Sequence, residues 1–277
     1  MSCQPIQSYL MEQRVDYIAR YEPSVKAFVD ETFDSDRVLD AIVQSDERLP
    51  LKGLLLGVKD IINVDQFPTR CGSVLPARLF NGPQASCATR LFKAGAVMVG
   101  KTVTAEFAVS DPGPTRNPRN LNHTPGGSSS GSAAAVAAGF CDIALGTQTS
   151  GSVIRPAGYC GTFGYKPSFG RVALDGVLPY SKSMDHIGLF AKDMSTMAAT
   201  LPILVTDWRN TKDSLVNKPI IGVPMGSYID LAMPHVSAQF EMIISAIKQM
   251  DAIVKPIILC DDIASHNYTH DLIANAE

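Results

Sequence analysis

The chain has 277 residues, of which 45% are hydrophobic and 18% charged, and its 24 basic and 27 acidic side chains leave a net charge of -3. Such a balance, without a basic cluster interleaved with aromatic residues, argues against direct binding to DNA or RNA. No stretch is apolar enough to cross a bilayer, and residues 1–19 carry charges throughout and lack the apolar core of a secretion signal. We therefore expect a cytoplasmic enzyme that acts on a small molecule and binds no membrane.

The cysteines are scattered along the sequence without the paired spacing of a metal site. They are Cys3, Cys71, Cys87, Cys141, Cys160 and Cys260. We expect free thiols in a reducing compartment. The sequence predicts neither a metal ion nor another cofactor.

Apolar periodicity predicts helices that come to alternate with short strands. In chain order these are helices over 8–21 and 33–45, a strand over 54–62, a helix over 85–94, a strand over 97–100, a helix over 130–139, a strand over 143–145, a helix over 195–205, a strand over 220–223, a helix over 236–250 and a strand over 253–258. This alternation is typical of an α/β fold with a central sheet covered by helices on both faces. We expect one domain over residues 1–277, with the polar stretch 206–218 as a surface excursion.

Two glycine-supported loops carry most of the hydroxyl groups of interest. Residues 126–139 hold a Gly-Gly-Ser-Ser-Ser run followed by alanines, and residues 149–157 hold Thr-Ser-Gly-Ser before Val-Ile-Arg-Pro-Ala. A serine linker would continue polar, whereas the alanines strongly favour a helix. A Walker phosphate loop would need a lysine followed by serine or threonine, which is absent here. The remaining interpretation is a pair of catalytic loops.

Lys59 follows a nearly continuous apolar run of the kind that forms a strand buried on both faces. Full burial can lower a lysine pKa by roughly 3 to 5 units and so leave a free amine near neutral pH. The alternative is an ordinary lysine at a strand end whose ammonium reaches the solvent.

The two loops, together with residues 57–62, resemble the amidase signature family of serine hydrolases, and most closely its malonamidase-like branch. The resemblance extends from about residue 22 to 192 and includes residues 117–118, 163–168 and 183–188. It implies a large mixed sheet between helices and a Ser-cisSer-Lys triad. In this sequence Lys59 is then the base, Ser128 the relay after a cis peptide bond, and Ser152 the nucleophile.

The resemblance implies an amidohydrolase that cleaves the C–N bond of a small linear amide through an acyl-enzyme on Ser152. The N–H groups of Thr149, Ser150, Gly151 and Ser152 would form the oxyanion hole. The alternative role for Ser152 is to cap a helix that starts near Pro156.

Ser129 and Thr149 are candidate supporting residues, Ser129 for the lysine amine and Thr149 for the nucleophile loop, and each could equally be a backbone cap. Gln148 and Ser150 stand where many family members have Asp and Gly. Arg155 follows the nucleophile by three residues, whereas many relatives have an arginine two residues after it. It is a candidate for binding a carboxylate-bearing substrate such as malonamate, or for pairing with an acid of the protein.

Family members usually run well beyond this length, and residues 271–277 read as the middle of a helix, so we expect a chain truncated at its C-terminus. An exposed sheet edge would favour self-association into a homodimer. Three alternatives remain: an amidotransferase subunit that delivers ammonia, an inactive relative that acts as a binding protein, and a Ser-His-Asp hydrolase that uses His186 or His123.

Overall fold

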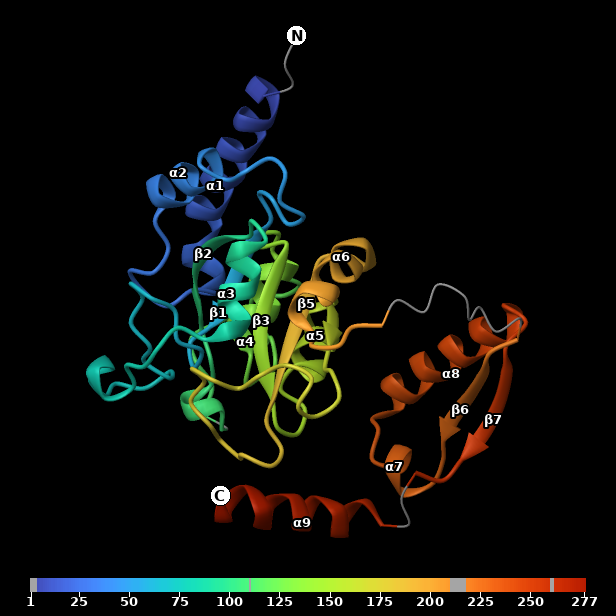
Figure 1. Cartoon of the computed structure of the whole chain (residues 1–277). Coiled ribbons are helices and arrows are strands. Elements are labelled where there is room, and N and C mark those ends of the chain that lie inside the picture. The colour runs from blue at the N-terminus through green and yellow to red at the C-terminus, as the bar shows by residue number, and fades with distance from the viewer. Residues whose placement is uncertain (1–3, 110, 210–217, 260–261) are drawn as a thin grey trace. The chain divides into compact units, whose positions relative to one another are not determined.

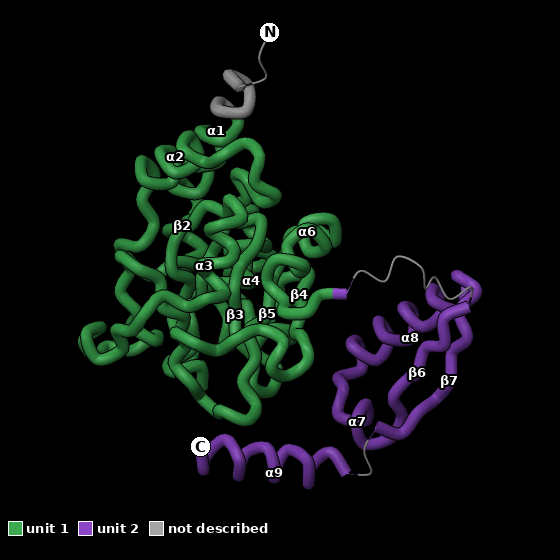
Figure 2. The backbone as a smooth tube through the Cα atoms, viewed as in Figure 1, with its two compact units in different colours: residues 1–208 green, residues 209–277 purple. Residues whose placement is uncertain are grey.

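The computed structural model describes residues 4–109, 111–209, 218–259 and 262–277 (Figure 1). Their contacts divide the chain into two compact units, Met1–Trp208 and Arg209–Glu277 (Figure 2). The sequence predicted one domain with a surface excursion over residues 206–218. The boundary falls inside that polar stretch, because the strands before and after it belong to separate sheets.

Unit 1, Met1–Trp208, is built on a five-stranded sheet in the order β2-β1-β3-β5-β4. β1 (Leu55–Lys59) is parallel to both of its neighbours, β2 (Val97–Thr102) and β3 (Ile143–Gln148). β5 (His186–Ala191) is antiparallel to β3, and the edge strand β4 (Phe163–Tyr165) is antiparallel to β5. The carboxyl ends of β1, β2 and β3 therefore lie at one edge of the sheet, where open α/β sheets commonly bind their ligands.

Each face of this sheet has its own apolar core. One core takes buried side chains from α1 (Gln4–Val25), α2 (Ser35–Val43), α4 (Ser130–Ala137) and α5 (Ile154–Cys160). The other takes them from α3 (Ser86–Lys93) and α6 (Met194–Leu204). Leu55 belongs to the first core and Leu56 to the second, as the two-residue period of a strand requires. The predicted α/β fold, with a mixed sheet covered on both faces, is confirmed.

Local chemistry explains where several elements begin and end. Asp34 and Asp193 cap α2 and α6, each accepting a hydrogen bond from a backbone N–H of the first turn. Gly161 ends α5 in the left-handed region, with φ 69°. Two short 3-10 helices, η1 (Ala77–Leu79) and η2 (Glu106–Ala108), lie in the connections of unit 1.

The strand predicted over residues 54–62 ends at Lys59. The Ile62 N–H donates to the Lys59 carbonyl at 2.9 Å and closes a turn, and the Asp60 side chain pairs with Lys101 at 3.0 Å. The apolar pattern extends through Ile61 and Ile62 because this turn is itself buried. Strands β4 and β5 were not predicted, because glycine interrupts their apolar residues. A helix near Pro156 was considered only as the alternative role for Ser152, and the structure has it as α5.

Unit 2, Arg209–Glu277, has a small sheet of its own, in which β6 (Ile220–Pro224) is parallel to β7 (Ile253–Ile257). Its helices are α7 (Ser227–Asp230), α8 (Pro234–Gln249) and α9 (Ile263–Ala276). α8 connects the two parallel strands and contacts β7, as in a βαβ unit. The predicted strands and the predicted helix over residues 236–250 are present here with shifted ends.

Cys71, Cys87, Cys141 and Cys160 are buried free thiols, and burial raises the pKa of each. Cys3 and Cys260 lie outside the described residues. Across the described ranges, no helix has both the length and the apolar character needed to span a bilayer.

The packing of α4 against the sheet gives a prediction for Gly131. A Cβ at this position would overlap the Ala27 carbonyl oxygen and the Val103 nitrogen, and both are backbone atoms that cannot rotate away. Gly131→Ala should lower the free energy of unfolding by about 2 to 3 kcal/mol in a urea titration, although glycine to alanine in a helix is usually stabilising.

Gly158→Ala is the matched control, because Gly158 lies in α5 and a Cβ there would meet nothing within 4 Å. It should leave the free energy of unfolding unchanged or raise it by up to about 1 kcal/mol. Equal stability of the two variants would show that α4 does not pack as described.

Candidate active site

Three loops at the carboxyl-end edge of the sheet carry the residues singled out from the sequence. Lys59 is the last residue of β1, Ser128 lies just before α4, and Ser152 lies between β3 and α5. β1 and β3 are neighbours in the sheet, and α4 contacts both of them. The fold thus brings residues that are far apart in the sequence to one place.

The Lys59 side chain is fully buried, with 0% of its surface exposed. Its Nζ lies 2.7 Å from Ser128 Oγ and 2.7 Å from Thr147 Oγ1. The alternative of an ammonium that reaches solvent is therefore excluded. Thr147 was missed by the sequence analysis. In the sequence it is a single threonine near the end of an apolar stretch. Such a residue does not indicate a contact with Lys59 unless the pairing of β3 with β1 is known.

Burial lowers the pKa of Lys59 to about 7, and the negative charge of Asp185 opposes this shift. Desolvation favours the neutral amine, and the two hydroxyl partners carry no charge that would favour the ammonium. Near neutral pH a large fraction of molecules therefore holds Lys59 as a free amine that can accept a proton.

The peptide bond between Gly127 and Ser128 is cis, as predicted. Ser128 is 1% exposed, so its hydroxyl is shielded from water together with the lysine amine. The carbonyl of Ser128 accepts a hydrogen bond from the Ala105 N–H at 3.0 Å, which ties this loop to the segment before η2.

Ser129 has another role than holding the lysine amine. Its hydroxyl donates to the Thr147 carbonyl at 3.1 Å and accepts from the Thr147 N–H at 3.2 Å. It therefore holds the backbone of the residue whose own hydroxyl binds Lys59. The sequence left Ser129 as a candidate for the lysine amine or for a backbone cap, and in the structure its hydroxyl binds the Thr147 backbone.

Ser152 is 7% exposed, and its carbonyl accepts a hydrogen bond from the Ser129 N–H at 3.3 Å. The two serine loops are therefore adjacent. Among the hydrogen bonds of the described residues, none joins Ser152 Oγ to Ser128 Oγ. The structure thus brings Lys59 and Ser128 into contact, and the predicted contact between Ser128 and Ser152 is not formed among the described residues. Catalytic hydrogen bonds frequently tighten only when substrate binds.

Gln148 organises the turn that contains Ser152. Its Oε1 accepts from the N–H groups of Val153 and Ile154, at 2.9 and 3.0 Å, and its Nε2 donates to the Ser150 carbonyl at 3.0 Å. An amide can do both, whereas the aspartate of many relatives could only accept. Gln148 was noted only as a departure from the family pattern. Its contacts show a side chain that supports the loop.

The N–H groups of Thr149, Ser150, Gly151 and Ser152 donate to none of the turn and loop hydrogen bonds in the described part of the chain. Successive N–H groups in a tight turn can converge on one anionic oxygen. The Thr149 hydroxyl donates to Asp185 Oδ1 at 2.5 Å, which braces the start of this turn against the segment before β5.

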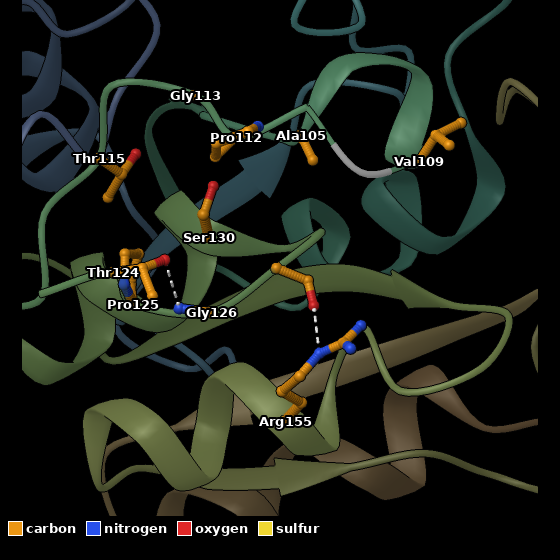
Figure 3. A pocket seen from close by; sticks show the side chains of 11 residues that line it. Ala105, Val109, Pro112, Gly113, Thr115, Thr124, Pro125, Gly126, Ser130 and Arg155 are labelled. Atoms are coloured by element: carbon orange, nitrogen blue, oxygen red, sulfur yellow. Dashed lines mark hydrogen bonds between the residues drawn. The ribbon is translucent and has the colours of Figure 1, made fainter.

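Arg155, in the first turn of α5, donates from Nε to the Gly127 carbonyl at 3.1 Å. Figure 3 shows this side chain at the wall of a pocket of about 270 Å³, which is also lined by Thr115, Gly126 and Ser130. Among the described residues, no carboxylate forms an ion pair with Arg155. Among the hydrogen bonds of the described residues, none uses its two terminal nitrogens.

The histidines of the alternative hydrolase mechanism form no hydrogen bond with Ser152 among the described contacts. His186 Nδ1 is 2.7 Å from the Met184 carbonyl and 3.3 Å from the Gln148 carbonyl, and its ring contacts Phe169. His123 is an exposed residue in a turn closed by hydrogen bonds to Asn117 and Asn120. Within the described ranges no group of three or more His, Cys, Asp or Glu side chains could hold a metal ion.

A family model described as Amidase matches residues 10–269. One relative, a glutamyl-tRNA(Gln) amidotransferase subunit from Synechococcus sp. (strain RCC307), is 37% identical over 252 residues, which cover 82% of this chain and 52% of that protein. The protein of the same name from Salinibacter ruber is 39% identical over 229 residues, which cover 79% of this chain and 44% of that protein. The chain spans about half the length of these relatives.

Solved structures of amidotransferase and amidase proteins also match the chain. The crystal structure of the corresponding glutamyl-tRNA(Gln) amidotransferase subunit from Thermotoga maritima matches with a TM-score of 0.82 and 31% identity, over 95% of this chain and 61% of that one. Native peptide amidase from Stenotrophomonas maltophilia matches with a TM-score of 0.78 and 28% identity, over 94% and 60% of the two chains. From the match over nearly its whole length and from these relatives, we conclude that the chain belongs to the amidase family.

Proposed function

We propose that this centre cleaves the C–N bond of an amide through an acyl-enzyme on Ser152. The observation that carries the proposal is the 2.7 Å hydrogen bond between Ser128 Oγ and the fully buried Lys59 amine. A serine is a weak nucleophile until a base within reach takes its proton, and a neutral lysine is such a base. The family to which the chain belongs supports the same class of reaction.

In the proposed reaction Ser128 gives its hydroxyl proton to Lys59 and takes the proton of Ser152. Ser152 turns toward Ser128 for this step, and its Oγ forms a bond to the amide carbonyl carbon. The N–H groups of residues 149–152 stabilise the resulting oxyanion. As the C–N bond breaks, the proton returns through Ser128 to the leaving nitrogen, and Lys59 becomes neutral again. Water then enters the same cycle and releases the acid.

The relatives favour transfer of ammonia over simple hydrolysis. The two relatives from Synechococcus and Salinibacter are named as subunits of an amidotransferase, at 37% and 39% identity, whereas the peptide amidase is 28% identical. We therefore propose that the chain works with partner subunits and passes on the ammonia that it releases, and that any tRNA is bound through those partners. A cytoplasmic location and a homodimer stay predictions.

The position of Arg155 supports the proposal that the substrate carries a carboxylate. Arg155 lines a pocket beside the cis peptide bond, and a guanidinium can bind a carboxylate through two hydrogen bonds. The relatives offer no support for malonamate in particular, so the proposal is limited to small amides with an acid group.

A fluorophosphonate probe should label Ser152 of the wild-type chain, as mapped by mass spectrometry. Lys59→Met should lower the labelling rate at mildly alkaline pH by at least about a hundredfold, the usual contribution of a general base. Lys93→Met is the matched control, because Lys93 is an exposed lysine at the end of α3, and it should label like wild type.

Other outcomes of this labelling experiment would contradict the proposal. If labelling survives Lys59→Met but is lost in His186→Ala, a Ser-His mechanism operates. If a correctly folded chain is never labelled at Ser152, the chain is a non-catalytic relative that binds rather than cleaves.

Arg155→Lys keeps the positive charge but removes the guanidinium, which can bind a carboxylate through two hydrogen bonds. For a carboxylate-bearing amide we expect kcat/KM to fall by about a hundredfold, as for a lost charged hydrogen bond. A neutral amide of the same length, measured by ammonia release, reports any damage to the Gly127 loop and should lose far less. Equal losses for the two substrates would show that Arg155 does not recognise the carboxylate.

A further inference from the structure

Asp185 joins two segments of the site and has no role in the mechanism above. It belongs to residues 183–188, one of the segments that carry the family resemblance, and is 7% exposed. Its Oδ1 accepts from the Thr149 hydroxyl at 2.5 Å, and its Oδ2 accepts from the N–H groups of Tyr180 and Ser181 at 2.8 and 3.0 Å. Three donors therefore converge on one buried carboxylate, which links the turn of Ser152 to the chain before β5.

The same carboxylate is the charge that acts on Lys59, although the two groups form no ion pair among the described contacts. The charged side chains on the neighbouring elements have partners of their own. β3 and α4 carry no charged residue, and the guanidinium of Arg155 on α5 binds the Gly127 carbonyl. On β2, Lys101 is paired with Asp60, and its register partner is Val58 rather than Lys59. On β5, His186 binds backbone carbonyls.

We propose that Asp185 is a positioning residue with two separable effects on the proposed reaction: its oxygens hold the Ser152 turn through Thr149, and its charge favours the protonated state of Lys59. The proposal rests on the function proposed above. The hydrogen bonds affect how fast Ser152 reacts, whereas the charge opposes the effect of burial and so raises the pH at which Lys59 loses its proton.

Asp185→Asn separates these effects, because asparagine has nearly the same shape. Its carbonyl can accept from the two backbone N–H groups, while its NH2 donates to the Thr149 hydroxyl, which can turn and act as acceptor. The hydrogen bonds survive and the charge is lost. Since an opposite charge raises a lysine pKa, its removal should lower the pKa of Lys59 further.

The experiment measures the rate at which a fluorophosphonate labels Ser152 as a function of pH. The acid limb is the pH range in which this rate falls as the solution becomes more acidic. Protonation of Lys59 should suppress labelling as the pH falls, so Asp185→Asn should move this limb to lower pH by about 1 unit. Thr149→Val removes the hydroxyl and keeps the charge. It should slow labelling by about tenfold or more while the limb stays at the wild-type pH.

Asp175→Asn is the matched control, because Asp175 also accepts from a backbone N–H and a hydroxyl, both of Ser86, at an exposed site. It should leave both rate and limb unchanged. An Asp185→Asn variant that reacts more slowly with an unmoved limb would overturn the proposal, since that result indicates a purely structural role.

A second readout keeps this test independent of activity. An NMR titration of the chain with isotope-labelled lysine, with the Lys59 signal identified by its loss in Lys59→Arg, gives the pKa of the amine directly. A lower midpoint in Asp185→Asn than in wild type supports the proposal, and an equal midpoint overturns it. Failure of wild-type Ser152 to label would count against the proposed function alone.

Discussion

The burial of the Lys59 amine between two hydroxyl groups is the interaction on which the site depends. An ammonium ion taken out of water without a carboxylate partner costs several kcal/mol, and a protein avoids this cost by lowering the pKa of the group. Hydroxyls can both donate and accept, so Ser128 and Thr147 satisfy a neutral amine as well as a charged one. The amine can therefore gain and lose a proton without leaving its place.

A second buried lysine shows how much the choice of partner matters. Lys101 is also 0% exposed, but its Nζ lies 3.0 Å from an Asp60 carboxylate oxygen and 2.9 Å from Thr69 Oγ1. Burial lowers the pKa of Lys101 and the Asp60 charge opposes this shift. Since β1 and β2 pair Lys101 with Val58 and Thr102 with Lys59, the two amines lie on opposite faces of the sheet. Asp60 is thus bound on the far side of the sheet, and no carboxylate of the described residues forms an ion pair with Lys59.

The sequence predicted the parts of this site that depend on local composition. The alanine-rich helix α4, the glycine-supported loops and the lysine after an apolar strand could all be found from neighbouring residues. Thr147 and Asp185 could not, because their roles arise only when β3 pairs with β1 on one side and with β5 on the other. For the same reason the sequence left two roles open for Ser129, a contact with the lysine amine or a backbone cap. The division into two units was not predicted because it depends on which strands pair, and a pattern of apolar residues does not show this.

The central claim is that Lys59 is uncharged in a large fraction of molecules near neutral pH. The most direct test is an NMR titration of the wild-type chain with isotope-labelled lysine, in which the signal lost in Lys59→Arg belongs to Lys59. We expect a midpoint at a pKa of about 7 for this amine. A midpoint near 10.5, the ordinary value for a lysine, would show that the amine stays charged at neutral pH and would contradict the account.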